Sequence, residues 1–209
     1  YIAGDALDDR VDTRGPLSAG DLLLLARGLH GALEAIHAVG VVHRDLKPAN
    51  LIVERRGGAA KLMDFGIAQF ADARLTAEGV AVGTLAYMAP EQIAMEELTP
   101  AVDQYALGLL IYEMLAGRPA FEDENSAALV LRRLKEKVPG VRLLRPEVPE
   151  AAAAVLARMV EWAPQDRFPS LKQAQVLVVM QNQDQPEHHI SDELHDGKHY
   201  HLYRQDQGF

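Results

Sequence analysis

Side chains that could bind a hard metal ion and an anion are concentrated in one part of the sequence. A carboxylate, an ammonium group and an amide follow one another at Asp45, Lys47 and Asn50, and a second carboxylate comes at Asp64. Carboxylate and amide oxygens are ligands that Mg²⁺ takes in proteins. A lysine adds a compact positive charge that can stabilise negative charge developing in a reaction. These residue types therefore predict a site for a metal-bound anion.

The same residues belong to three short polar motifs that occur in a fixed order. The motifs are His43-Arg44-Asp45-Leu46-Lys47-Pro48-Ala49-Asn50, Asp64-Phe65-Gly66 and Ala89-Pro90-Glu91, the last preceded by Gly83-Thr84 and Tyr87. Each motif alone has an ordinary explanation, because Asp, Gly and Lys-Pro are common at turns. Together they resemble the catalytic loop, the metal-binding triplet and the end of the activation loop of protein kinases. From residue 1 to about residue 180 the chain is similar to bacterial eukaryotic-like (Hanks-type) Ser/Thr kinases.

The resemblance implies a role for each polar residue. Asp45 would accept the proton of a substrate hydroxyl, and Lys47 would neutralise charge on the transferring phosphoryl group. Asn50 and Asp64 would hold Mg²⁺ together with the phosphates of ATP. A lysine two residues after the aspartate is the Ser/Thr-kinase form of the motif, so the expected substrates are Ser and Thr hydroxyls of proteins.

Further residues match supporting positions of the family. His43 and Phe65 correspond to members of the stacked apolar column that links the two kinase lobes. Asp103, at the start of a helix, corresponds to the acid that holds the backbone of the catalytic loop, and it also suits the helix dipole. Glu91 and Arg167 correspond to a buried ion pair that ties the activation loop to the later helices.

Regulation is predicted from Arg44 and two threonines. An arginine directly before the catalytic aspartate marks kinases whose activation loop is often controlled by phosphorylation. A phosphate on Thr76 could pair with Arg44 through charge-assisted hydrogen bonds. An unmodified, solvated Thr76 remains the alternative. Thr84 lies in the segment expected to meet the substrate.

The start of the chain resembles the hinge between the two kinase lobes. Tyr1, Ile2 and Ala3 would contact adenine through their backbone, and Ile52 would form the floor of the nucleotide cleft. No glycine-rich loop and no lysine-bearing strand precede the catalytic loop in this sequence. We therefore expect a C-terminal lobe without its small N-terminal lobe, inactive in isolation. The alternatives are a non-catalytic binding module and, less favoured, a small-molecule kinase of the aminoglycoside type, which lacks the long loop between the second and third motifs.

The elements that must position these residues are mostly helical. Apolar residues at helical spacing predict a helix from residue 18, with a capping pattern at Ser18, to a stop at Gly40. Four more helices are expected over 103–115, 126–137, 149–162 and 170–180, the first of them apolar on nearly all sides and hence central. Short strands are expected at 41–42, 51–53 and 61–63. The predicted class is α+β, mostly α-helical, with a kinase domain over 1–180 and a polar, weakly ordered tail over 181–209.

Composition narrows the class of protein. The 209 residues are 48% hydrophobic, enough for one sizeable core, and the formal net charge of −9 argues against nucleic-acid binding. The sequence contains no cysteine, which fits a reducing, cytoplasmic compartment. No apolar run is long enough to span a bilayer, so any membrane anchor would lie outside this sequence. The histidines of the tail have irregular spacing and predict no metal site.

Overall fold

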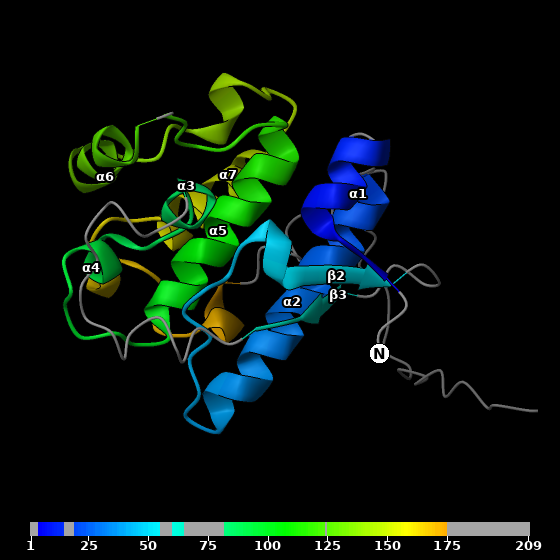
Figure 1. Ribbon diagram of the computed structural model, residues 1–209, viewed down its shortest axis with the longest axis horizontal. Coiled ribbons are helices and arrows are strands. Elements are labelled where there is room, and N and C mark those ends of the chain that lie inside the picture. Colours follow the sequence, from blue (N-terminus) through cyan, green and yellow to red (C-terminus); the bar gives the residue numbers. More distant parts are fainter. Residues whose placement is uncertain (1–3, 15–18, 55–59, 65–81, 124, 175–209) are drawn as a thin grey trace, which may run out of the picture.

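Helix α5 (Ala101–Ala116) forms the centre of the molecule (Figure 1). In the computed structural model, which describes residues 4–14, 19–54, 60–64, 82–123 and 125–174, all residues from 102 to 112 are buried. A helix that is apolar on all sides must be covered by other elements, so its predicted central position is confirmed. The helix ends at Gly117, whose φ of 75° is the left-handed conformation that glycine adopts without steric cost.

Three longer helices surround α5. Helix α2 (Ala19–Ala38) packs against α5 with the buried leucines of its predicted apolar face, and Gly40 follows its end with φ 76°. Helix α7 (Glu150–Met159) packs on α5 near Gly108, where a Cβ would lie 2.6 Å from Val160 Cγ1. Helix α6 (Ser126–Lys135) begins at Asn125, whose side chain accepts hydrogen bonds from the N–H groups of Ala127 and Ala128. The predicted helices over 126–137 and 149–162 are therefore confirmed, with earlier ends.

A small antiparallel sheet lies beside α2, on the opposite side of α5 from α6 (Figure 1). Its strands are β1 (Gly4–Ala6), β2 (Leu51–Glu54) and β3 (Ala60–Leu62), in the order β1-β2-β3. Leu51 pairs with Leu62, and Ile52 pairs with Ala6 on one side and Lys61 on the other. Strand β1 leads into helix α1 (Leu7–Arg14). The strands near 51–53 and 61–63 were predicted, whereas β1 and α1 were not.

Short elements complete the described chain. They are α3 (Val82–Leu85), α4 (Pro90–Ile93) and the 3₁₀ turns η1 (Pro48–Asn50), η2 (Val141–Leu143), η3 (Pro164–Asp166) and η4 (Leu171–Gln173). The mostly helical α+β class is confirmed. Within the described ranges, no helix has both the length and the apolar character needed to cross a membrane.

Two predicted elements differ from the structure. Val41 and Val42 do not form a strand. The N–H groups of the two residues that follow donate to the carboxylate of Asp103 and not to a neighbouring strand. The helix expected over 170–180 begins as the 3₁₀ turn η4, and its part from 175 onward lies outside the described residues, as do Ser18 and the predicted tail.

Candidate active site

The first motif forms an irregular segment between α2 and β2. It ends in the turn η1, which Pro48 begins, and the fixed φ of proline suits the first position of a helical turn. The N–H of Asn50 donates to the carbonyl of Lys47 at 3.0 Å, which closes the turn. Asn50 is thereby placed immediately before β2, with its side chain turned back toward Asp45.

Asp45, Lys47 and Asn50 converge on one carboxylate oxygen. Lys47 Nζ and Asn50 Nδ2 each lie 2.9 Å from Asp45 Oδ2, and Asn50 Nδ2 also donates to the backbone carbonyl of Asp45 at 2.8 Å. Asp45 and Asn50 are both buried. Two donors on one oxygen, one of them charged, fix the carboxylate in a defined orientation.

Lys47 also connects this segment to the third motif. Its Nζ donates to Thr84 Oγ1 at 2.9 Å, so a single ammonium group bridges Asp45 and α3. Thr84 is buried, with 7% of its surface exposed. Thr84, the residue expected to meet the substrate, is therefore linked to the proposed catalytic residue Asp45 through the side chain of Lys47.

Asp64 is positioned by the end of the β2–β3 hairpin. The N–H of Met63 donates to the carbonyl of Asn50 at 2.9 Å, and the carbonyl of Met63 accepts from His43 Nε2 at 3.0 Å. Because Asp45 N–H donates to His43 Nδ1, the ring proton belongs on Nε2. Asp64 follows directly, exposed and with φ 48°. It therefore comes at the same hairpin end as Asn50.

The backbone of the first motif is held by Asp103, from the first turn of α5. Its Oδ2 accepts from the N–H of His43 and its Oδ1 from the N–H of Arg44, both at 2.8 Å. His37 Nε2 donates to the same carboxylate at 2.7 Å. Asp103 is 1% exposed, and three donors compensate its buried charge. The predicted role of Asp103 is confirmed.

The third motif is fixed by a buried ion pair. Arg167 Nη1 and Nη2 lie 2.6 and 2.8 Å from the two carboxylate oxygens of Glu91, in a bidentate arrangement. Both side chains are almost fully buried. The next residue, Gln92, accepts from the N–H of Ala89 and donates to the carbonyl of Arg44. The predicted Glu91–Arg167 pair is confirmed.

Tyr87 and Glu113 form a second buried polar contact beside this motif. The hydroxyl of Tyr87 donates to Glu113 Oε2. Burial raises the pKa of Tyr87 far above its ordinary range, and the nearby Glu113 carboxylate raises it further. Burial also raises the pKa of Glu113, although the hydrogen bond from Tyr87 opposes the rise. This contact ties the segment before Ala89 to α5.

The remaining predicted residues lie in different places. Ile52 is half-buried in β2, and its side chain borders Gly4 of β1. Arg44 takes part through its backbone, with a left-handed φ of 70°. Tyr1, Ile2, Ala3, Phe65 and Thr76 lie outside the described residues.

The described side chains fit a magnesium ion that is shared with phosphates. Asn50 directs its Nδ2 toward Asp45, so its Oδ1 faces away from Asp45 and could bind a metal ion. The exposed carboxylate of Asp64, at the nearby end of the β2–β3 hairpin, could supply a second oxygen ligand. In the described parts of the chain, no group of three or more His, Cys, Asp or Glu side chains is arranged to hold a metal ion. Two oxygen side chains suit Mg²⁺, which usually takes its other ligands from phosphates and water.

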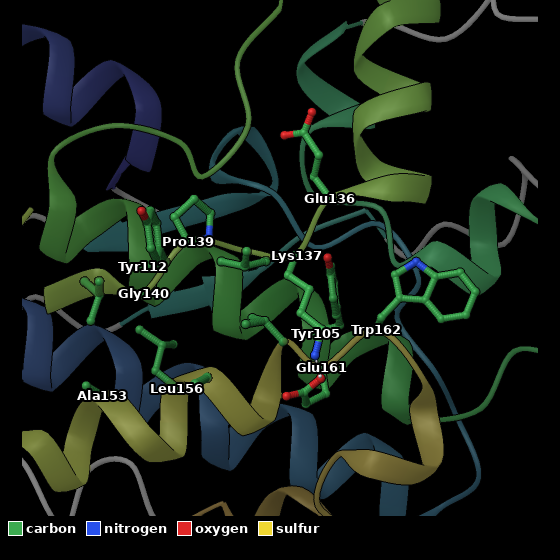
Figure 2. Close-up of a pocket in the computed structure, with 14 residues that line it drawn as sticks. Tyr105, Tyr112, Glu136, Lys137, Pro139, Gly140, Ala153, Leu156, Glu161 and Trp162 are labelled. Atoms are coloured by element: carbon green, nitrogen blue, oxygen red, sulfur yellow. Dashed lines mark hydrogen bonds and ion pairs between the residues drawn. The ribbon is translucent and has the colours of Figure 1, made fainter. Parts of the chain in front are cut away.

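A small cavity lies outside the candidate active site. It has a volume of about 80 Å³ and lies between α5, α7 and the connection after α6 (Figure 2). Its lining includes Tyr105 and Trp162, and Lys137 crosses toward Glu161 with an ion pair at 3.4 Å. Pockets for small molecules usually measure about 300–1,000 Å³. The cavity is too small for a nucleotide, and none of the motif residues lines it.

Sequence patterns did not reveal two residues of this site. His37 is half-buried, like several other residues of α2, so nothing in the sequence distinguishes it. Gln92 directly follows the third motif but belongs to no motif itself. His37 contacts Asp103 across 66 positions of sequence, and Gln92 contacts Arg44 across 48, so only the fold brings these pairs together.

Comparison with known proteins agrees with this geometry. Residues 1–178 match the family model described as "Protein kinase domain". The chain is 39% identical over 170 residues to the serine/threonine-protein kinase PknH of Mycobacterium tuberculosis, which covers 81% of this chain and 27% of PknH. It is 41% identical over 176 residues to the serine/threonine-protein kinase Pkn1 of Myxococcus xanthus, covering 82% and 25%.

The chain therefore spans about a quarter of the length of the curated relatives that it matches. The family match covers most of the chain and includes all three motifs. The first motif contacts the residue before Asp64 through the Asn50 carbonyl, and it contacts the segment of the third motif through Lys47–Thr84 and Arg44–Gln92. On these grounds the chain belongs to the protein kinase family.

Proposed function

We propose that this chain carries the catalytic loop of a Ser/Thr protein kinase, which transfers the γ-phosphoryl group of ATP to Ser and Thr hydroxyls of proteins. The observation that carries the proposal is the Asp45 carboxylate, held at 2.9 Å by both Lys47 and Asn50. The names of the relatives and the lysine two residues after Asp45 both favour Ser and Thr as acceptors. The net charge of −9 favours a protein substrate over nucleic acid.

Asp45 orients the acceptor and takes its proton. As the hydroxyl oxygen bonds to the γ-phosphorus, the bond from phosphorus to the β–γ bridging oxygen breaks and ADP leaves. Lys47, already 2.9 Å from Asp45 and Thr84, supplies positive charge where the acceptor and the phosphoryl group meet. Asn50 and Asp64 would hold Mg²⁺, which neutralises phosphate charge when it is bound.

We assign residues 1–180 to the hinge and C-terminal lobe of this kinase and leave 181–209 outside it. In this assignment Tyr1, Ile2 and Ala3 contact adenine, and Ile52 forms the floor below it. A second lobe with a glycine-rich loop would cover the phosphates from the other side. We propose that Arg44 binds the phosphate group when Thr76 is phosphorylated. The proposed location of the protein is the cytoplasm.

The test is a phosphoryl-transfer assay of the full-length protein and its Asp45→Asn variant. Asparagine keeps the size of the side chain but cannot accept the proton, so kcat should fall about 10²- to 10⁴-fold. Asp9→Asn, at an exposed position of α1, is the matched control and should keep the wild-type rate. The 209-residue chain assayed alongside should transfer little phosphate. Equal activity of wild type and Asp45→Asn would refute the proposal, and no activity in either, with peptide binding retained, would favour a binding module.

A further inference from the structure

Arg44, the residue that precedes Asp45, is held on both sides of its Cα atom. Arg44 has φ 70°, a left-handed conformation that side-chain-bearing residues rarely adopt. Its N–H donates to Asp103 Oδ1 at 2.8 Å, and its carbonyl accepts from Gln92 Nε2 at 2.8 Å. The Arg44 carbonyl belongs to the peptide group that joins Arg44 to Asp45. The orientation of this peptide group sets the direction of the Asp45 side chain.

Gln92 can hold the Arg44 carbonyl because its own amide is fixed. Gln92 is 2% exposed, and its Oε1 accepts from the N–H of Ala89 at 2.9 Å. This bond sets the oxygen toward Ala89, so the Nε2 group must face Arg44. The amide is therefore a rigid bridge between the start of α4 and the first motif.

Helix α4 has a firm attachment of its own. Glu91, the neighbour of Gln92, is bonded bidentately to Arg167 from the last described part of the chain. The four-residue helix is thus anchored by one side chain and holds the Arg44 carbonyl with the next. A movement of α4 would pull on the peptide group before Asp45.

We propose that Gln92 is a positioning residue for Asp45, acting through the strained conformation of Arg44. This inference rests on the proposed function of Asp45. Strained backbone persists at functional sites only when surrounding groups hold it. Asp103 holds the N–H of Arg44 and Gln92 holds its carbonyl, so the peptide groups on both sides of the strained residue are fixed. Without the Gln92 donor, the peptide group that joins Arg44 to Asp45 loses this hydrogen bond, and Asp45 is less firmly held toward Lys47 and Asn50.

The test compares two buried glutamines in the full-length protein. Gln104 on α5 is also 2% exposed and bridges backbone groups in the same way, to the N–H and carbonyl of Phe168 at 3.0 Å. Gln92→Met and Gln104→Met each remove two such bonds and should lower Tm by similar amounts. Because the loss of this hydrogen bond loosens the strained backbone before Asp45, we expect kcat of Gln92→Met to fall about tenfold or more. KM for ATP and peptide should stay within about twofold, since Gln92 reaches Asp45 only through its hydrogen bond to the neighbouring residue Arg44.

Gln104→Met should keep kcat within about twofold of wild type, because the side chain of Gln104 bonds to Phe168 and not to the first motif. A second variant, Gln92→Glu, keeps the acceptor for Ala89, replaces the donor to Arg44 with an oxygen and adds a buried negative charge. It should lose kcat to the same extent even if Gln92→Met does not fold. Equal kcat in Gln92→Met, Gln104→Met and wild type would overturn the inference, and so would a loss confined to KM. If Asp45→Asn abolishes turnover in the same assay, such a result leaves the proposed function intact.

Discussion

The buried pair Glu91–Arg167 allows a prediction in which a second mutation restores stability. The side chains of Arg167 and Glu91 are 0% and 2% exposed, with N–O distances of 2.6 and 2.8 Å. Arg167 also donates to the backbone carbonyls of Ala101, Glu161 and Trp162 at 3.0, 2.7 and 2.9 Å. Loss of the arginine therefore leaves a buried carboxylate and up to three carbonyls without their partner.

The magnitudes follow from these contacts. Removing one member of a buried ion pair costs about 3–5 kcal/mol, because the other charge remains buried and unpaired. We expect Glu91→Met to lower the free energy of unfolding by that amount. Arg167→Met should cost about 3 kcal/mol more, since the three carbonyls lose a charged donor. A domain is stable by only about 5–15 kcal/mol, so Arg167→Met should lose a large part of its stability.

The double variant distinguishes this explanation from a simple loss of contacts. Glu91→Met combined with Arg167→Met removes the stranded carboxylate, so it should be more stable than Arg167→Met alone by about 2–4 kcal/mol. Urea unfolding of the 209-residue chain measures the difference through the fluorescence of Trp162, the single tryptophan. Far-UV circular dichroism provides an independent reading of the same transition. A double variant that is less stable than either single variant would refute the reasoning.

Two further predictions concern α5. Burial raises the pKa of Glu113 above its ordinary value of 4.5, so its stabilising contribution is fully present below that pH and is lost as the pH rises through the folded-state pKa. In urea unfolding at several pH values, Glu113→Gln should therefore gain stability relative to wild type as the pH rises above about 4.5, and a constant difference would contradict the burial effect. Gly108→Ala places a Cβ 2.6 Å from Val160 Cγ1 and 3.2 Å from Met159 Cβ. It should lower the free energy of unfolding by about 1–3 kcal/mol, whereas Gly31→Ala, in open space on α2, should not lower it.

The helices were predictable where apolar residues follow a clear period. Helices α2, α6 and α7 carry such a pattern, whereas α5 was predictable from an apolar run too long for a strand. Strand β1 and helix α1 carry few apolar residues, and their structure depends on pairing with β2, which is distant in sequence. The error at Val41–Val42 has the same origin. Two β-branched residues favour a strand, but Asp103 takes the following N–H groups from another part of the chain.

The site was predictable in its residues but not in its geometry. The motifs and their resemblance to a family identified Asp45, Lys47 and Asn50, yet no spacing rule places Thr84 beside Lys47. That contact joins residues 37 positions apart, and it depends on how α3 is held over the first motif. Thr76 and the hinge residues 1–3 lie outside the described residues, so their roles stay predictions.

Buried polar side chains from distant positions orient the first motif, in addition to its hydrogen bonds to Met63 at the end of the small sheet. Asp103 reaches it across 59 and 60 positions of sequence, and Gln92 reaches it across 48. Both side chains bind backbone groups of the motif and not its side chains. A substitution at Asp103 or Gln92 changes the shape of the motif while every motif residue is kept. Loss of activity in a chain with all three motifs intact is therefore the expected consequence of damage to these two side chains, and motif matching alone would not detect it.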